Sequence, residues 1–289
     1  MSDFLPSELV VTAKGTIYHI DILPENLAKK IIVVGDQDRV ELVSNYFDTI
    51  SHKSQHREFC VHTGTFKGKE ISVISTGIGT DNIDIVINEL DALVNIDLET
   101  RTEKAEKTSL EIIRIGTCGI LHDDIPVDSF ILSTHSLGID NVGHFYQVEK
   151  DSETSRLEVE IESKVKLPKH VKPYLAKASE ELNQKLYSDQ IVKGITVTSS
   201  GFYGPQGRKL RLPLAENGML DSFSEFVSKD GQKFANLEME TSTLFTLCNG
   251  LGHKATGICL GLANRRKKEF TNNYQKKITE LIEYVLDRF

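Results

Sequence analysis

Two short stretches of the sequence combine side chains that could bind a heterocyclic base and a sugar. The first is Gly201-Phe202-Tyr203-Gly204-Pro205-Gln206-Gly207-Arg208, whose glycines and proline predict a bent loop. This loop presents an aromatic ring, an amide and a guanidinium, and an amide carries both donors and an acceptor on one plane. The second is Leu237-Glu238-Met239-Glu240, whose carboxylates could accept hydrogen bonds from a sugar diol.

Three arginines indicate an anion site. The turn Gly35-Asp36-Gln37-Asp38-Arg39 offers backbone amides where a strand is expected to enter a helix, and a helix N-terminus favours an anion. Arg57 follows in sequence, and Arg114 interrupts an otherwise apolar strand pattern. A buried guanidinium needs a partner, because desolvation without one is costly. That partner is either a core carboxylate such as Glu240 or a phosphate, which the arginines and the Thr117 hydroxyl could clamp.

The elements that position these residues alternate between strand and helix patterns. Short apolar runs predict strands at 30–34, 71–75, 112–115, 195–198 and 258–262, the third ending at Gly116. Helical spacing follows in 40–47, 86–94, 243–247 and 278–286, and Asp81 or Asn82 is expected to cap the second helix. The alternation predicts an α/β fold with a central mixed, largely parallel sheet flanked by helices, whose strand ends carry the functional loops.

We expect one domain over residues 1–289. Two charged stretches, 97–109 and 148–169, interrupt the alternation and are interpreted as solvated insertions rather than linkers.

Bulk composition excludes several classes of protein. The formal net charge is −8 and the isoelectric point is about 5.6, so the protein lacks the excess of positive charge that attracts nucleic acid. The N-terminal residues have no signal-peptide pattern and no apolar run reaches membrane-spanning length, so we expect neither secretion nor membrane insertion. Four scattered cysteines fit neither a metal site nor a disulfide framework. The sequence therefore predicts a cytoplasmic protein without a metal.

Taken in order, the motifs resemble the nucleoside phosphorylase family, and its uridine-cleaving branch most closely, from about Tyr18 to the C-terminus. The matching pieces are Val34-Gly35-Asp36 with Arg39, His56-Arg57-Glu58-Phe59, Ser75-Thr76-Gly77-Ile78-Gly79, Arg114-Ile115-Gly116-Thr117, Phe202-Tyr203 with Gln206 and Arg208, Glu238-Met239-Glu240, and Asn264-Arg265. Several ordered motifs are more specific together than any one is alone. The resemblance implies a nucleoside phosphorylase-type fold and reversible phosphorolysis of uridine to uracil and ribose 1-phosphate.

The resemblance also implies roles for individual residues. Phosphate, the co-substrate, would be bound by Gly35, Arg39, Arg114 and Thr117 with Arg57 of a neighbouring subunit; ribose by His19, Met239 and Glu240; and the base by Phe202, Gln206, Arg208 and Arg265. Arg114, Glu240, Gln206 and Arg208 would be the catalytic residues. The resemblance implies a homo-oligomer, a dimer or hexamer, with shared active sites. It implies no cofactor, and Glu58 matches a family position near a monovalent cation between subunits.

Other interpretations stay open at this point. Phe202 and Tyr203 could be core aromatics, Glu238 a structural carboxylate and His19 a surface residue. Related purine phosphorylases carry an aspartate near the position of Asn264, which favours a pyrimidine here. The alternative functions are a purine nucleoside phosphorylase or nucleoside hydrolase on the same fold, and a non-catalytic nucleoside-binding protein.

Overall fold

The structure is a computed structural model that describes residues 4–289; the first three residues of the stretch expected to lack a signal peptide lie outside it. The strands are β1 (Lys30–Val34), β2 (Thr49–His56), β3 (Phe59–Phe66), β4 (Lys69–Ser75), β5 (Ile96–Asp97), β6 (Thr102–Glu103), β7 (Glu111–Ile120), β8 (Phe130–Gly138), β9 (Tyr174–Lys177), β10 (Val192–Thr198), β11 (Phe234–Glu238), β12 (Lys254–Asn264) and β13 (Glu269–Phe270). The α-helices are α1 (Gln37–Ser44), α2 (Thr80–Asn95), α3 (Ser152–Lys164), α4 (Glu180–Leu186), α5 (Met219–Glu225), α6 (Thr241–Leu251) and α7 (Tyr274–Arg288), with short 3₁₀ turns η1 (Pro24–Asn26), η2 (Val142–Phe145) and η3 (Gly204–Gln206).

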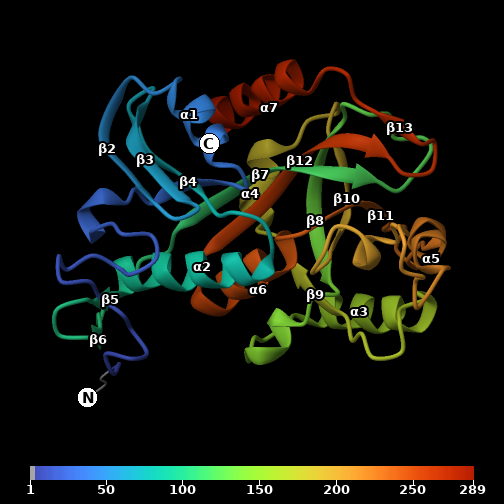
Figure 1. Cartoon of the computed structure of the whole chain (residues 1–289), viewed down its shortest axis with the longest axis horizontal. Helices are drawn as coiled ribbons and strands as arrows, with labels where there is room; N and C mark the ends of the chain where they lie inside the picture. The colour runs from blue at the N-terminus through green and yellow to red at the C-terminus, as the bar shows by residue number, and fades with distance from the viewer. Residues whose placement is uncertain (1–3) are drawn as a thin grey trace.

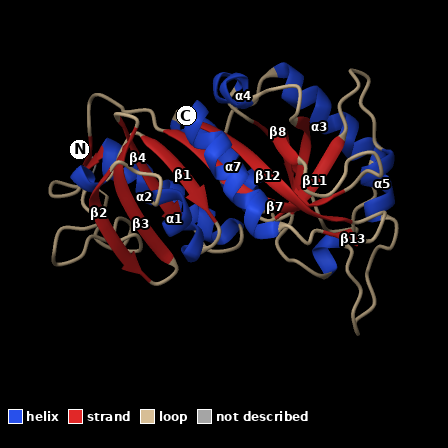
Figure 2. Cartoon of the chain, turned by 90° about the horizontal axis from the view of Figure 1, so that it is seen from above, coloured by secondary structure: helices blue, strands red, loops and turns tan. Residues whose placement is uncertain are grey.

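One large mixed sheet organises the molecule (Figures 1 and 2). Its central pairings, β1 with β4 and β7, β12 with β7, and β10 with β8 and β11, are parallel. Its outer pairings, which include the β2–β3–β4 meander, are antiparallel. Because β12 pairs with both β7 and β8, the strands β7, β12, β8, β10 and β11 form a closed ring. The predicted α/β fold with a mixed sheet flanked by helices is confirmed.

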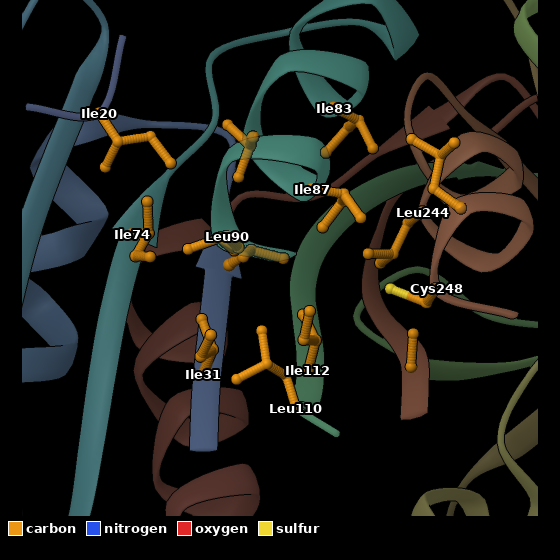
Figure 3. Packing of buried hydrophobic residues seen from close by; sticks show 14 of the residues in the cluster. Ile20, Ile31, Ile74, Ile83, Ile87, Leu90, Leu110, Ile112, Leu244 and Cys248 are labelled. Atoms are coloured by element: carbon orange, nitrogen blue, oxygen red, sulfur yellow. The ribbon is translucent and has the colours of Figure 1, made fainter. Parts of the chain in front are cut away.

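The apolar run of β1 is buried on both faces, as expected of a central parallel strand. Ile31 and Val33 join a core cluster with α2 and α6, whereas Ile32 and Val34 belong to a second cluster that includes the buried apolar residues of α1 and α7. Figure 3 shows the first cluster, in which β1 and β7 side chains gather with those of α2 and α6. The two helix layers thus hold β1 and β7 in place, and the loops that follow these strands are positioned from both sides.

Two local predictions are wrong. The strand predicted to end at Gly116 continues to Ile120, because β12 pairs with it along its whole length. A side chain on Gly116 would overlap the guanidinium of Arg114, so this glycine makes room for an arginine rather than a turn. Gly79, with φ of 104°, is the N-cap of α2, and neither Asp81 nor Asn82 caps it.

The two charged stretches contain regular structure. Residues 97–109 include one strand of the small β5–β6 hairpin. Within 148–169, the helix α3 is capped by Asp151, whose carboxylate accepts a hydrogen bond from the Thr154 amide at 2.7 Å. Leu157 and Ile161 of α3 are buried. The second stretch is therefore solvated on one face only.

Within residues 4–289, no helix combines the length and apolarity needed to cross a membrane. The four cysteines are free thiols, three of them buried and Cys60 half-buried.

Candidate active site

One cavity of about 970 Å³ is lined by residues of the segments predicted to bind base and sugar and by residues of the predicted anion site. The predicted site residues in its wall are Gly35, Arg39, Arg114, Thr117, Phe202, Gln206, Arg208, Met239 and Glu240. They come from the turn after β1 and the first turn of α1, from the middle of β7, and from the segments that follow β10 and β11. β7, β10 and β11 belong to the ring of strands, and β1 pairs with β7. The sequence therefore identified most of the polar wall of one cavity.

The turn after β1 is positioned by strand register and by a helix cap. Val34 lies opposite Ile115 of β7, so the Gly35 turn and Thr117 lie at neighbouring strand positions. Asp36 caps α1 by accepting a hydrogen bond from the Asp38 amide at 3.1 Å. The first turn of α1 then carries Arg39 into the cavity wall.

Arg39 is buried, with an exposed fraction of 6%. Its Nη1 donates to the carbonyl oxygen of Ile115 at 3.3 Å, and its Nη2 donates to the hydroxyl of Tyr274 at 2.9 Å. Its Nε has no acceptor among the described residues. A buried, unpaired donor of this kind is rare in folded proteins and costs free energy, which makes the side chain a candidate ligand-binding group.

Arg114 lies between two carboxylates. Its Nη2 is ion-paired with Glu240, its Nη1 lies 3.3 Å from Glu238 Oε2, and Nη1 also contacts the Cys259 thiol at 3.5 Å. Of the two partners considered from the sequence, the core carboxylate Glu240 is present in this structure. Arg114 nevertheless lines the cavity, and its Nε, like that of Arg39, has no acceptor within residues 4–289.

The two glutamates have different surroundings. Glu238 accepts hydrogen bonds from the amides of Glu240 and Thr241 and from the Thr198 hydroxyl, at 2.5–3.1 Å. It therefore anchors the N-terminus of α6, as its structural interpretation predicts, and it also lies in the cavity wall. Glu240 accepts from the Gly79 amide at 2.9 Å. Burial raises the pKa of the Glu240 carboxyl, Arg114 lowers it, and the nearby Glu238 charge raises it again, for a net increase.

The loop after β10 presents an amide and a guanidinium to the cavity. Gln206, 3% exposed, is followed by Gly207 at φ 67°, which turns the chain so that the Arg208 guanidinium donates to the Gln206 amide oxygen. Arg208 also donates to the Phe202 carbonyl at 2.6 Å and stacks 3.7 Å from the Phe202 ring centroid. Burial lowers the pKa of Arg208 to about 10, with a contribution from the Arg265 charge.

The aromatic pair of this loop is not part of the core. Phe202 and Tyr203 are 50% and 55% exposed, and their rings pack edge to face at 5.3 Å. The interpretation as core aromatics is wrong, because a loop that leaves the end of a strand carries its side chains away from the sheet.

Three predicted site residues do not line this cavity. Arg265 donates from Nη1 to the carbonyl of the cavity-lining Gln206 at 3.1 Å. Arg57 is exposed in the β2–β3 turn, with φ of 56°. The half-buried His19 is held by Glu89, which lies 2.6 Å from Nδ1 and accepts hydrogen bonds from the His19 and Ile20 amides.

Sequence reasoning missed the apolar part of the wall, formed by Ile78, Cys118, Leu237, Leu262, Ala263 and Phe270. Leu262 and Ala263 directly precede Asn264-Arg265, so their place at the end of a strand was the available signal. It also missed Tyr274, which is close to Arg39 only in the folded chain.

Asn264 is buried and outside the cavity wall. Its amide nitrogen donates to the carbonyls of His122 and Ile125 at 2.8 and 2.9 Å, and its oxygen accepts from two following amides. All of its main hydrogen-bonding capacity is therefore used to hold the turn after β12. In the described chain, no group of three His, Cys, Asp or Glu side chains is arranged to hold a metal ion.

The chain is similar to known proteins in sequence and in fold. Residues 29–287 match the family described as Phosphorylase superfamily. A uridine phosphorylase of Thermococcus kodakarensis is 30% identical over 95% of this chain and 87% of its own length, and that of Escherichia coli is 27% identical over 93% and 94%. A solved structure described as a Trypanosoma brucei nucleoside phosphorylase that shows uridine phosphorylase activity has a TM-score of 0.88 and 29% identity, covering 97% of this chain and 98% of its own.

Proposed function

The chain belongs to the phosphorylase superfamily, and on that basis we propose that it catalyses the reversible phosphorolysis of uridine to uracil and ribose 1-phosphate. It is a nucleoside phosphorylase, and thus a glycosyltransferase, with inorganic phosphate as its second substrate.

The observation that carries the proposal is the pair of buried arginines in one cavity wall. Arg39 and Arg114 are each more than nine-tenths buried, and each has an Nε without an acceptor in the described chain. A phosphate oxygen is a strong acceptor for such donors, and charge-assisted bonds are stronger than neutral ones. The turn amides at Gly35 and the Thr117 hydroxyl supply further donors in the same wall.

The proposed chemistry follows from the charges that develop. As the bond between ribose and base breaks, the sugar becomes positive and the departing base becomes negative. Phosphate, held by the arginines, attacks the anomeric carbon, so the new carbon–oxygen bond replaces the carbon–nitrogen bond and the electron pair leaves with uracil. The phosphate dianion also stabilises the positive sugar. This route needs no covalent enzyme intermediate.

Gln206 and Arg208 are proposed to hold the uracil ring. The amide of Gln206 can donate to one uracil carbonyl and accept from N3–H, while Arg208 donates to the other carbonyl, directly or through water. In this structure Arg208 already donates to Gln206, which aligns the two groups side by side. Both contacts become stronger as the base gains negative charge, so they serve catalysis as well as recognition.

Glu240 and Met239 are proposed to hold the ribose, with Glu240 accepting hydrogen bonds from the 2′- and 3′-hydroxyls. We further propose that a neighbouring subunit contributes His19 and Arg57, since neither lines the cavity of its own subunit. We also propose that the protein is a homo-oligomer, either a dimer or a hexamer, and that it is located in the cytoplasm. A monovalent cation is proposed to bind between subunits near Glu58. Glu58 lies in the cavity wall, where it could contribute to such a cation site.

The surroundings of Asn264 disfavour a purine nucleoside as the main substrate. The side chain is committed to the turn after β12, and neither it nor an aspartate in its place could donate a proton into the cavity without breaking that turn. Arg39 and Arg114 disfavour a hydrolase, because water needs no cationic clamp.

The test is release of free base from uridine, with inosine and methylthioadenosine alongside, in the presence and absence of phosphate. We expect uracil release that requires phosphate. Base release without phosphate would establish a hydrolase instead. Preferential release of base from inosine would indicate a purine phosphorylase, and no release from any substrate would indicate a binding protein.

A further inference from the structure

Tyr274, the first residue of α7, is hydrogen-bonded to an arginine of the cavity wall. Its hydroxyl accepts a hydrogen bond from Arg39 Nη2 at 2.9 Å, and its ring packs against the cluster beneath α1 and α7. In Figure 1, α7 lies beside α1, the helix that carries Arg39. Tyr274 itself is absent from the cavity wall, so it reaches the cavity only through the arginine.

The position of Tyr274 is itself fixed. The preceding Thr271 is buried and donates to the carboxylate of Asp128. The Thr271 hydroxyl accepts a hydrogen bond from the Asn273 amide at 3.0 Å, and the Thr271 amide donates to the Leu262 carbonyl at 2.8 Å. The start of α7 is thus tied to β12 and to the turn before β8, and the tyrosine hydroxyl is held at a defined place.

Two protein acceptors therefore hold the two ends of the Arg39 guanidinium, the Ile115 carbonyl on Nη1 and the Tyr274 hydroxyl on Nη2. Because the guanidinium is planar, fixing both Nη atoms also fixes the direction of the Nε–H bond. That bond is the one without an acceptor among residues 4–289. An arginine ordered before its ligand arrives loses less side-chain entropy on binding.

We propose that Tyr274 is a positioning residue for phosphate, acting through Arg39. The inference rests on the proposed function, because it assumes that Arg39 binds the phosphate co-substrate. Tyr274 touches neither substrate. Its hydroxyl holds the guanidinium in the orientation that phosphate requires, so its removal weakens phosphate binding while uridine binding persists.

The test is Tyr274→Phe, which removes the hydroxyl and keeps the packed ring. We expect the KM for phosphate to rise about three- to ten-fold, the range of one hydrogen bond and one newly mobile side chain. The KM for uridine should change less than about two-fold, since neither Gln206 nor Arg208 is hydrogen-bonded to Tyr274. Calorimetric titration of inorganic phosphate into the enzyme should show the same loss of affinity.

Tyr46→Phe is the matched control. Tyr46 follows α1, and its hydroxyl donates to Glu283 of α7 at 2.8 Å, so this change also removes a tyrosine hydrogen bond between the α1 region and α7. Tyr46 lies outside the cavity wall, and its loss should leave the phosphate KM unchanged. In an Arg39→Ala background, Tyr274→Phe should have no further effect on phosphate binding.

The outcomes separate this inference from the proposed function. If the unmodified enzyme releases no uracil with phosphate, the proposed function fails. If the unmodified enzyme does release uracil, three results would overturn the positioning role alone. Tyr274→Phe could leave the phosphate KM unchanged, or it could raise the KM values for phosphate and uridine equally. It could also weaken phosphate binding as much in the Arg39→Ala background as in the unmodified enzyme. An equal rise in the Tyr46→Phe variant would likewise overturn it, since that result would assign the effect to general contact between the helices.

Discussion

At the residue scale, the central feature of the site is one guanidinium between two buried carboxylates. Arg114 pairs with both Glu238 and Glu240, so this buried cluster contains two carboxylates and one cation. Glu238 is compensated by the N-terminus of α6, whereas the pKa of Glu240 is raised. Glu240 is consequently the member whose hydrogen bonds can be redirected to a substrate at the least cost to the fold.

Arg114→Ala should destabilise the protein as well as abolish phosphate-dependent turnover. Removing the cation leaves two buried carboxylates and should cost about 3–5 kcal/mol of unfolding free energy near neutral pH. Without Arg114 the pKa of Glu240 rises further, so the folded variant binds more protons than its unfolded chain. The difference in unfolding free energy between the variant and the unmodified protein should therefore become smaller as the pH falls from about 8 to about 5.5. Denaturant titrations at both pH values measure this, and a deficit independent of pH would show that the carboxylates are not its source.

Glu240→Gln should lower kcat/KM for uridine about 10- to 100-fold, the value of one or two charge-assisted hydrogen bonds. The protein should stay folded, because Arg114 keeps Glu238 at 3.3 Å as a partner. For 2′-deoxyuridine, which lacks one of the hydroxyls, the loss should be smaller, so the preference for uridine should decrease. Steady-state kinetics with both substrates is the measurement. An unchanged preference would remove Glu240 from the diol site.

At the element scale, the loop after β10 depends on one glycine conformation. Gly207 has φ of 67°, and a Cβ there would lie 2.9 Å from Leu220. Gly204, three residues earlier, has no atom within 4 Å of the same position and no positive φ. The two glycines look alike in the sequence, but only Gly207 sets the direction in which Gln206 and Arg208 point.

Gly207→Ala should therefore raise the KM for uridine, and Gly204→Ala should not. Left-handed backbone costs an alanine about 1–2 kcal/mol, and relief of that strain would displace Gln206, which corresponds to a five- to thirty-fold change at about 1.4 kcal/mol per tenfold. The KM for phosphate should stay the same in both variants, because Arg39 and Arg114, the proposed phosphate ligands, belong to other elements. Equal behaviour of the two alanine variants in initial-rate assays would contradict this account of the loop.

At the scale of the whole molecule, we propose that the site is completed by a neighbouring subunit. Arg57 is exposed in the β2–β3 turn and His19 is half-buried, and both lie outside the cavity wall of their own subunit. Glu89 already orders His19 through its ring and its backbone amide. Such ordering suits a residue that must meet a partner's substrate with little loss of entropy.

Mixing two inactive variants tests this arrangement. Arg57→Ala and Gln206→Ala subunits, reassembled at equal concentrations, should recover about a quarter of the unmodified activity. Half of randomly formed pairs are mixed, and one of the two sites in each mixed pair is then intact. As the control, Gln206→Ala mixed with Glu240→Gln should recover nothing, because both residues belong to the same subunit's cavity. Confirmed mixed oligomers without recovered activity would rule out shared sites.

The sequence by itself determined the α/β alternation, the strands β1, β4, β7, β10 and β12, and most of the polar wall of the cavity, whereas β8 and β11 of the ring were not predicted. Those features are local: the apolar run 30–34, the helical spacing of 278–286, and the glycine-bent loop before Gln206 are each readable within about ten residues. The resemblance to nucleoside phosphorylases worked for the same reason, since its motifs are short segments.

Tertiary structure alone decided how those segments meet. The ring closed by β7 and β12 and the bond from Arg39 to Tyr274, 235 residues away, have no local signal. The sequence named Glu240, 126 residues from Arg114, only as one of two candidate partners. Gly116 shows the limit most clearly, because glycine in a strand predicts a turn, and only the folded position of Arg114 explains it. Contacts between distant residues depend on which faces are packed together, and burial of apolar surface specifies that packing only once the whole chain has folded.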